Sequence, residues 1–278
     1  MKILFDQFSR KVSKCITQQY STSFSLGIMA LSPSIRPAIY SIYGYVRLAD
    51  EIVDSFHDYN KSLLLERFTE QTWQALDERI SLNPVLQSFQ EAVHRYQIDR
   101  QLIRQFLHSM QMDLSPMEYD SARYKEYILG SAEVVGLMCL QVFVEGDAKA
   151  YDALKPYAMK LGSVFQKVNF LRDLKDDYQV LGRTYFPNIE MSCFDNHIKR
   201  SIEADIEAEF KEALIGIRRL PPCSRFGVYL AYKYYWSLFR KIQQLPAQRI
   251  LQERIRIPNV QKLSLMMSSY VQYKVAVL

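Results

Sequence analysis

Two stretches of this chain repeat one arrangement of acidic side chains in otherwise apolar surroundings. The first reads YGYVRLADEIVD and places Asp50 four residues before Asp54. The second reads QKVNFLRDLKDD and places Asp173 four residues before Asp177. Because a helix turns by about 100 degrees per residue, side chains four residues apart lie on one face. Each stretch therefore predicts a pair of carboxylates on a single helical face.

Other polar residues extend each acidic face along its helix. The residues that share these faces are Tyr43, Arg47, Gln166 and Asn169. Glu51 and Asp176 lie on the flanks of the two faces. The first helix is apolar at nearly all of its remaining positions, which is typical of a buried helix. We therefore expect the two acidic faces to point inward or into a cleft.

Carboxylates that converge in a partly dry cavity repel one another and raise each other's pKa values. A divalent cation relieves this repulsion. Oxygen ligands from carboxylates and an amide suit magnesium, which keeps several waters and bridges protein carboxylates to substrate phosphates. The pattern therefore predicts Mg²⁺, with Mn²⁺ as a substitute, and a phosphate or diphosphate ester as the substrate.

Three cationic residues lie close to the acidic faces in the sequence: Arg47, Lys167 and Arg183. Guanidinium groups bind phosphate oxygens in pairs, so these residues are candidates for holding the substrate. Arg47 also fits a plainer role as the ion-pair partner of Asp50 or Asp54 in the core. A single acidic pair is ordinarily a solvated face, and only the recurrence of the pattern favours a metal site.

The elements that must position these residues read as long helices. The chain has 278 residues, 49% of them hydrophobic and only nine of them glycine, and strand patterns are nearly absent. The segments with helical periodicity are 4–20, 35–57, 61–80, 84–94, 99–112, 121–145, 150–180, 197–219 and 224–244. We predict an all-α protein with one domain over residues 1–278.

Cysteine spacing and charge limit the remaining possibilities. The four cysteines are far apart, which suits a reducing compartment, and the N-terminus lacks the features of a signal peptide. The most apolar run, VVGLMCLQVFV, is too short to cross a bilayer. The net charge is +5, with basic residues concentrated between Arg240 and Lys262, yet no nucleic-acid-binding motif is present. These observations predict a cytoplasmic protein that does not bind nucleic acid.

The two acidic motifs, in this order and separation, resemble those of the squalene and phytoene synthases. The resemblance begins at YSTSFSLG, includes GRTYFP and YILGSAEVVGLMCLQVF, and extends to YYWSLFRKI, so it covers most of the chain. The wording RLADEIVD is closer to bacterial phytoene synthases than to squalene synthases. The resemblance implies an isoprenoid synthase fold of the class I terpenoid synthases, a helical bundle around a central cavity.

The resemblance also implies an activity, the magnesium-dependent head-to-head condensation of two prenyl diphosphates. Loss of one diphosphate gives an allylic cation, which the double bond of the second molecule captures to form a cyclopropylcarbinyl diphosphate. A second ionisation then gives a linear hydrocarbon. We expect a non-reductive reaction of two geranylgeranyl diphosphates to phytoene, as in carotenoid biosynthesis.

Site residues are carried over from the family one position at a time. The resemblance assigns metal binding to Asp50, Asp54, Asn169, Asp173 and Asp177. It assigns substrate binding to Ser23, Arg47, Gln166, Asn169, Arg183 and Tyr235. The four aspartates are implied to be catalytic, together with the cavity tyrosines Tyr43 and Tyr127. Two residues depart from the common pattern. Glu51 stands where many relatives have aspartate, and Glu133 reads either as a satisfied buried carboxyl or as a further cavity acid.

Alternatives remain open at this point. One is a dehydrosqualene or squalene-pathway synthase that uses farnesyl diphosphate, because cavity depth decides the chain length. A class I cyclase or chain elongase would use similar chemistry, and a non-catalytic helical assembly factor would keep the fold alone. Lipid substrates further predict peripheral contact with the inner face of the cytoplasmic membrane through the basic C-terminal region. We expect a monomer or a weak oligomer.

Overall fold

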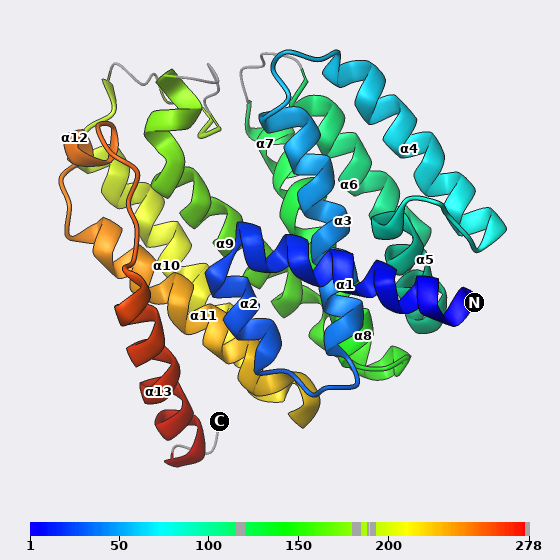
Figure 1. Cartoon of the computed structure of the whole chain (residues 1–278). Helices are drawn as coiled ribbons and strands as arrows, with labels where there is room; N and C mark the ends of the chain where they lie inside the picture. The colour runs from blue at the N-terminus through cyan, green and yellow to red at the C-terminus, as the bar shows by residue number, and fades with distance from the viewer. Residues whose placement is uncertain (115–119, 180–184, 188, 190–192, 276–278) are drawn as a thin grey trace.

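The computed structural model describes residues 1–114, 120–179, 185–187, 189 and 193–275, and the regular structure of this part of the chain consists of helices, with no strand (Figure 1). Its helices are α1 (Lys2–Tyr20), α2 (Thr22–Met29), α3 (Arg36–Asp54), α4 (Lys61–Glu78), α5 (Pro84–Tyr96), α6 (Arg100–Met112), α7 (Ser121–Ile128), the π-helical turn η1 (Leu129–Glu133), α8 (Val134–Phe143), α9 (Ala148–Gln179), α10 (Asn196–Arg219), α11 (Pro222–Gln243), α12 (Ala247–Ile250) and α13 (Asn259–Val275). The prediction of an all-α protein is confirmed.

Three helices were not predicted from the sequence, namely α2, α12 and α13. Helix α2 has only eight residues and is apolar around most of its circumference, so it has little periodicity to detect. Its beginning is fixed by Ser21, whose hydroxyl accepts a hydrogen bond from the backbone of Phe24 at 3.1 Å. Helix α12 is a single turn, and α13 has a weak apolar face.

The predicted helix 121–145 is interrupted by the π-helical turn η1. Neighbouring helices approach this turn closely on two sides, and glycines make the approach possible. A β-carbon on Gly130 would lie 2.7 Å from the carbonyl oxygen of Gln105 on α6, and one on Gly162 of α9 would lie 2.5 Å from that of Ala132. Single π-helical turns occur frequently at functional sites. Together, α7, η1 and α8 thus form a wall that is clamped between α6 and α9.

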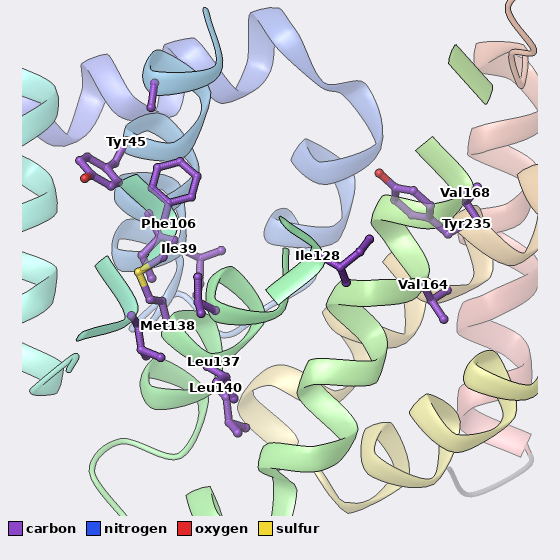
Figure 2. Close-up of a cluster of buried hydrophobic side chains, with 14 of the residues drawn as sticks. Ile39, Tyr45, Phe106, Ile128, Leu137, Met138, Leu140, Val164, Val168 and Tyr235 are labelled. Carbon is purple, nitrogen blue, oxygen red and sulfur yellow. The ribbon is translucent and has the colours of Figure 1, made fainter. Parts of the chain in front are cut away.

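The run Ser121–Phe143 is the one described helical stretch that is long and apolar enough to span a membrane, with a mean hydropathy of 1.3. Half of its apolar segment of 18 residues is buried inside the protein. A core helix gives the same signal, so this observation is weak evidence for a membrane span. Figure 2 shows Leu137, Met138 and Leu140 of this stretch in the buried cluster.

Aromatic packing joins the helices of the N-terminal half. Tyr45 of α3 stacks on Phe89 of α5 with ring centroids 3.8 Å apart, and Phe68 and Phe106 lie within 5.6 Å of the Tyr45 ring. Such ring pairs contribute about 0.5–1.5 kcal/mol beyond the area that they bury. They fix the back of α3, so that its opposite, acidic face keeps one direction.

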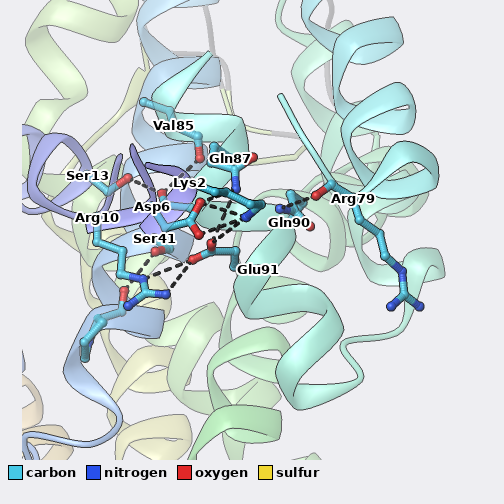
Figure 3. A network of polar contacts seen from close by, with 12 residues as sticks. Lys2, Asp6, Arg10, Ser13, Ser41, Arg79, Val85, Gln87, Gln90 and Glu91 are labelled. Carbon is cyan, nitrogen blue, oxygen red and sulfur yellow. Dashed lines mark hydrogen bonds and ion pairs between the residues drawn. The ribbon is translucent and has the colours of Figure 1, made fainter. Parts of the chain in front are cut away.

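A polar network holds α1 against α5 (Figure 3). The carboxylate of Asp6 accepts hydrogen bonds from Lys2 and from Gln87, the latter at 2.9 Å. Arg10 donates to Glu91 at 3.0 Å. Since α1 also packs on α3, this network places the C-terminal end of α1 beside the acidic end of α3.

Helix α9 packs on α8 and η1 with one part of its surface and on α10 and α11 with others. On the α10 side, Glu209 accepts hydrogen bonds from Lys160 at 3.0 Å, from Ser163 at 3.0 Å and from Lys167 at 2.8 Å. These half-buried contacts fix the rotation of α9 about its axis, which decides where its acidic face points.

The close crossing at η1 gives a stability prediction. We expect Gly162→Ala to destabilise the fold by about 1–3 kcal/mol, because its new methyl group overlaps a backbone carbonyl that cannot move away. The matched control is Gly27→Ala, whose methyl group would meet its nearest neighbour at 3.4 Å and would favour the helix. Thermal melting of both variants checks this. Equal melting temperatures for the two would contradict the steric argument.

Candidate active site

The two acidic helices line a single cavity of about 630 Å³. Its walls come from α2, α3, α7, η1, α8, α9, α10 and α11, with further residues from α1 and α6. The carboxylates among its lining residues are Asp50, Asp54, Asp113, Asp173, Asp176 and Asp177. The sequence interpretation depended on two acidic faces, distant in the sequence, that line the same cavity. The structure has this arrangement.

Along α9 the cavity changes from polar to apolar. Its lining residues between Gln166 and Asp177 are mostly polar, whereas those between Leu154 and Phe165 are apolar apart from the hydroxyl group of Tyr157. At 1.5 Å per residue, the apolar part of this wall is about 16 Å long. One helix thus lines the cavity with a polar part followed by a long apolar part. A prenyl diphosphate likewise has a charged head and a long apolar tail.

Asp50 is held in an electrostatically unfavourable place. Burial, together with the carboxylate of Asp54, raises the pKa of Asp50 to about 8, although the guanidinium of Arg47 opposes the shift. Asp113 and Glu51 add to the rise. A cation bound beside Asp50 would reverse this effect, because it would favour the charged carboxylate.

Arg47 lies at the cavity and pairs within its own helix. Its hydrogen bond and ion pair are with Glu51, one helical turn further along α3. Against the effect of burial, the charge of Asp50 also acts on Arg47 and raises the pKa of its guanidinium. Its guanidinium also lies 4.5 Å from the ring centre of Tyr20, and its Nε is buried without a hydrogen bond to any described residue. The glutamate at position 51 therefore holds Arg47 in place beside the acidic face.

The carboxylate of Asp173 is bound by two arginines. Arg172 donates to its Oδ1 at 2.8 Å, and Nε of Arg254 lies 2.7 Å from the same oxygen. Arg254 belongs to the segment after α12, where the backbone N–H of Ile255 donates to the carbonyl of Arg172 at 3.4 Å. The basic C-terminal region thus reaches the cavity itself, which the sequence interpretation did not foresee.

An aromatic cluster joins α2, α3, α9 and α11 next to the acidic groups. Phe165 stacks on Tyr235 with centroids 4.0 Å apart, and Phe24 lies 5.4 Å from Tyr43 and 5.9 Å from Tyr235. The hydroxyl of Tyr235 donates to Oδ1 of Asn169 at 3.2 Å. Burial raises the pKa of both Tyr43 and Tyr235, so both phenols are neutral at physiological pH.

A second aromatic cluster lies around Tyr127. Its hydroxyl donates to Asp113 at 2.8 Å, and its ring lies 5.2 Å from that of Tyr185. Phe170 of α9 stacks on Tyr185 at 4.1 Å. All four side chains line the cavity, so the predicted cavity tyrosine Tyr127 is accompanied by residues that the sequence interpretation missed.

Some predicted site residues lie elsewhere. Ser23 is half-buried, but the serine of that segment that lines the cavity is Ser21. Lys167 donates to Glu209 on α10, away from the acidic face, because helix periodicity places it on a different side of α9. Arg183 lies outside the described residues. Gln166 and Asn169 line the cavity as expected.

Glu133 does not line the cavity formed by the described residues, so its placement does not favour the interpretation as a further cavity acid. It ends the π-helical turn. Burial and the neighbouring Glu209 raise its pKa, while Lys160 and Lys167 oppose the rise. It therefore belongs to the polar group between α9 and α10.

The functional candidates that the sequence interpretation missed are Ser21, Phe24, Asp113, Arg172, Tyr185 and Arg254. For two of these residues the sequence contained a feature that could have identified them. Arg172 directly precedes Asp173, and Arg254 lies in the basic C-terminal cluster. Asp113 stands alone between methionine and leucine with no periodic partner, so only the fold brings it to the cavity.

The site fits a divalent cation by the chemistry of its ligands. Among the described residues, six carboxylates line the cavity against three guanidinium groups, those of Arg47, Arg172 and Arg254. However, no three described acidic, histidine or cysteine side chains lie close enough together to form a metal cluster. The excess of oxygen ligands suits Mg²⁺, and the binding of a metal stays a prediction.

Comparison with known proteins identifies relatives of the same fold and of related sequence. A crystal structure of a dehydrosqualene synthase in complex with ligand shares the fold, with a TM-score of 0.83 at 20% identity over 97% of this chain and 98% of that one. The chain is also 26% identical over 257 residues to phytoene synthase 1 of Zea mays, which covers 82% of this chain and 60% of the maize protein. It is 28% identical over 199 residues to 4,4'-diapophytoene synthase of Staphylococcus haemolyticus, covering 68% and 66%.

The all-helical fold around the cavity is the fold of that dehydrosqualene synthase structure. The family model for squalene/phytoene synthase matches residues 17–261. The chain therefore belongs to the squalene/phytoene synthase family, whose members are synthases of the prenyltransferase type. It spans about 60% of the length of the plant phytoene synthases that it matches.

The raised pKa of Asp50 predicts how stability depends on pH when a chelator removes divalent ions. The folded protein holds a proton on Asp50 that the unfolded chain has lost, so its stability falls as pH rises from about 4 to about 8. We expect Asp50→Asn to melt at least about 2 °C above the parent protein at pH 8, with no difference near pH 4. A variant that melts below the parent protein at pH 8 would contradict this assignment. Asp152→Asn, an exposed change on α9, is the control.

Proposed function

We propose that this protein joins two geranylgeranyl diphosphates head to head to form phytoene, with release of both diphosphates. The observation that carries the proposal is the single cavity, in which two acidic helical faces meet an apolar wall. Phytoene synthases among the relatives support the longer substrate. The similarity to 4,4'-diapophytoene synthase and to a dehydrosqualene synthase structure keeps the farnesyl alternative open.

In this mechanism Asp50, Asp54, Asn169, Asp173 and Asp177 would hold Mg²⁺. When bound, the metal would neutralise the charge that develops on the departing diphosphate. Arg47, Arg172 and Arg254 line the same end of the cavity and bind phosphate oxygens directly. Arg172 and Arg254 also bind the carboxylate of Asp173, so a diphosphate would compete with this carboxylate for the same guanidinium groups.

The chain's own residues then guide the carbon skeleton. The carbon–oxygen bond of the first substrate breaks, and its electron pair leaves with the diphosphate. The double bond of the second molecule attacks the allylic cation, and loss of a proton closes the cyclopropane ring. The apolar wall between Leu154 and Phe165 keeps water from the cation, and the faces of nearby aromatic rings stabilise positive charge.

Substitution of the aspartates tests the proposal. We expect Asp173→Asn and Asp50→Asn to fold normally but to lose at least about 100-fold in turnover, since even the loss of a residue that only orients a metal ligand costs 10–100-fold. The assay contains magnesium and labelled geranylgeranyl or farnesyl diphosphate, and the hydrocarbon product is measured. The exposed Asp152→Asn on the same helix α9 is the matched control and should be fully active.

The outcomes of this assay separate the alternatives. Phytoene from geranylgeranyl diphosphate supports the proposal, and a hydrocarbon from farnesyl diphosphate alone supports the shorter-chain synthase. Cyclised products or longer prenyl diphosphates would indicate a cyclase or an elongase. No turnover of either substrate by the parent protein would leave a non-catalytic assembly factor.

We further propose that the protein is cytoplasmic and works at the inner face of the membrane. The exposed basic residues of the C-terminal region, Arg240, Arg249 and Arg256, would attract anionic lipid headgroups. We expect the protein to float with anionic vesicles more than with neutral ones, and less at high salt.

Replacement of these three arginines by serine should reduce flotation with anionic vesicles. The matched control replaces three exposed arginines of the helices α4, α6 and α7 instead, namely Arg67, Arg104 and Arg123. Equal flotation of both triple variants would mean that the C-terminal region does not mediate contact. No flotation of the parent protein would exclude the membrane proposal.

A further inference from the structure

One buried carboxylate of the cavity has no role in the mechanism above. Asp113 lies directly after the last residue of α6 and is only 8% exposed. It is remote in sequence from both acidic motifs. Its charge nevertheless raises the pKa of Asp50, which places it near the reacting end of the cavity. A buried carboxylate in a cavity already rich in carboxylates is costly, and this cost calls for a functional reason.

Asp113 binds the hydroxyl group of a cavity tyrosine. The hydroxyl of Tyr127, which is 3% exposed, donates to Oδ2 of Asp113 over 2.8 Å. This distance is typical of a strong hydrogen bond between a hydroxyl group and a carboxylate. A phenol has a single proton to donate. Because that proton is committed to Asp113, any other group that meets the Tyr127 oxygen meets it as a hydrogen-bond acceptor.

The same carboxylate anchors a second tyrosine. The hydroxyl of Tyr185 lies 3.5 Å from Oδ1 of Asp113, and the rings of Tyr127 and Tyr185 are nearly parallel, at 27° to each other. Phe170 lies against Tyr185 at an angle of 10°. Three rings from α7, α9 and the segment beyond α9 thus form one ordered surface with both hydroxyls directed at Asp113. The side chain of Tyr127 therefore has little freedom to turn its hydroxyl elsewhere.

We propose that Asp113 is a positioning residue that fixes Tyr127 as a proton acceptor for the carbocation. This inference rests on the proposed function, because only a cationic intermediate needs such an acceptor. Joining two prenyl diphosphates without a reductant releases two protons, one for each diphosphate that leaves. Tyr127 receives one of these two protons.

The step balances without any further reactant. A C–H bond of the cationic intermediate breaks, and its two electrons form a new carbon–carbon bond to the cationic carbon. This bond closes the ring in the first proton loss and gives a double bond in the second. The proton binds to the oxygen of Tyr127 while the original phenol proton passes to Oδ2 of Asp113. Tyr127 stays neutral throughout, and Asp113 becomes a carboxylic acid that returns the proton to water after product release.

Three variants test this assignment in the turnover assay: Asp113→Asn, Tyr127→Phe and the double variant. Asparagine keeps the size of the side chain but can donate to the phenol oxygen, which would reverse the polarity of the pair. We expect each single variant to lose about 100-fold in kcat, as for a lost acid–base group, with KM changed by less than about twofold. The double variant should lose no more than either single variant. The matched control, Tyr59→Phe, removes an exposed hydroxyl and should be fully active.

The products show where the pair acts, and two results would overturn the inference. Unreacted substrate indicates the first proton loss, whereas accumulated cyclopropylcarbinyl diphosphate indicates the second. Losses that multiply in the double variant, or an Asp113→Asn variant as active as the parent protein, would mean that Asp113 serves packing alone.

A binding measurement keeps the test valid if the parent protein turns over neither substrate. The probes are geranylgeranyl-dimethylamine, which is protonated at pH 7 and carries one N–H donor, and its neutral carbon isostere. Calorimetry should show that the parent protein prefers the ammonium compound. Asp113→Asn and Tyr127→Phe should each reduce this preference by about tenfold, without adding to one another. An unchanged preference would overturn the inference whatever the protein's reaction is.

Discussion

The excess of negative charge around one cavity is the constraint on which the rest of this structure depends. Six carboxylates converge on a space with largely apolar walls, and burial raises the pKa of Asp50 to about 8. Left alone, such a cluster would favour protonated or unfolded states. The chain limits this cost locally. Glu51 holds Arg47 beside the first acidic face, and Arg172 and Arg254 bind Asp173 of the second. The negative charge of the cavity carboxylates that these arginines do not balance is available to bind a cation.

Keeping such a cavity both narrow and apolar requires close packing between its walls. Glycines at the crossings of η1 with α6 and α9 let backbones approach where any side chain would overlap a carbonyl. The Lys160–Glu209–Lys167 contacts fix the rotation of α9 from outside, so that its polar and apolar halves both face the hollow. The charged end and the apolar end are therefore parts of one helix. A substrate with an anionic head and an apolar tail is aligned simply by lying along it.

The sequence was sufficient for the fold class and for both acidic faces, because helical periodicity is a local property that survives without tertiary contacts. The same periodicity could have excluded Lys167, which lies on a different side of α9 and binds Glu209. Asp113 and Arg254 could not be found this way. Each stands outside any repeating pattern and reaches the cavity only through the packing of α6 and of the segment beyond α12. Helix α2 was missed because it is short and lacks a polar face.

Two tyrosine hydroxyls and one thiol of the cavity are in states that suit cationic chemistry. In both aromatic clusters a tyrosine donates a hydrogen bond to a residue distant in the sequence, Tyr235 to Asn169 and Tyr127 to Asp113. Burial raises the pKa of Cys139, which also lines the cavity, to about 12. Its thiol is therefore protonated at neutral pH, and the thiolate that would trap a carbocation is absent. The cavity thus offers a cation oriented tyrosine oxygens as hydrogen-bond acceptors and the faces of aromatic rings. The thiol of Cys139 stays protonated and is therefore a weaker nucleophile than a thiolate.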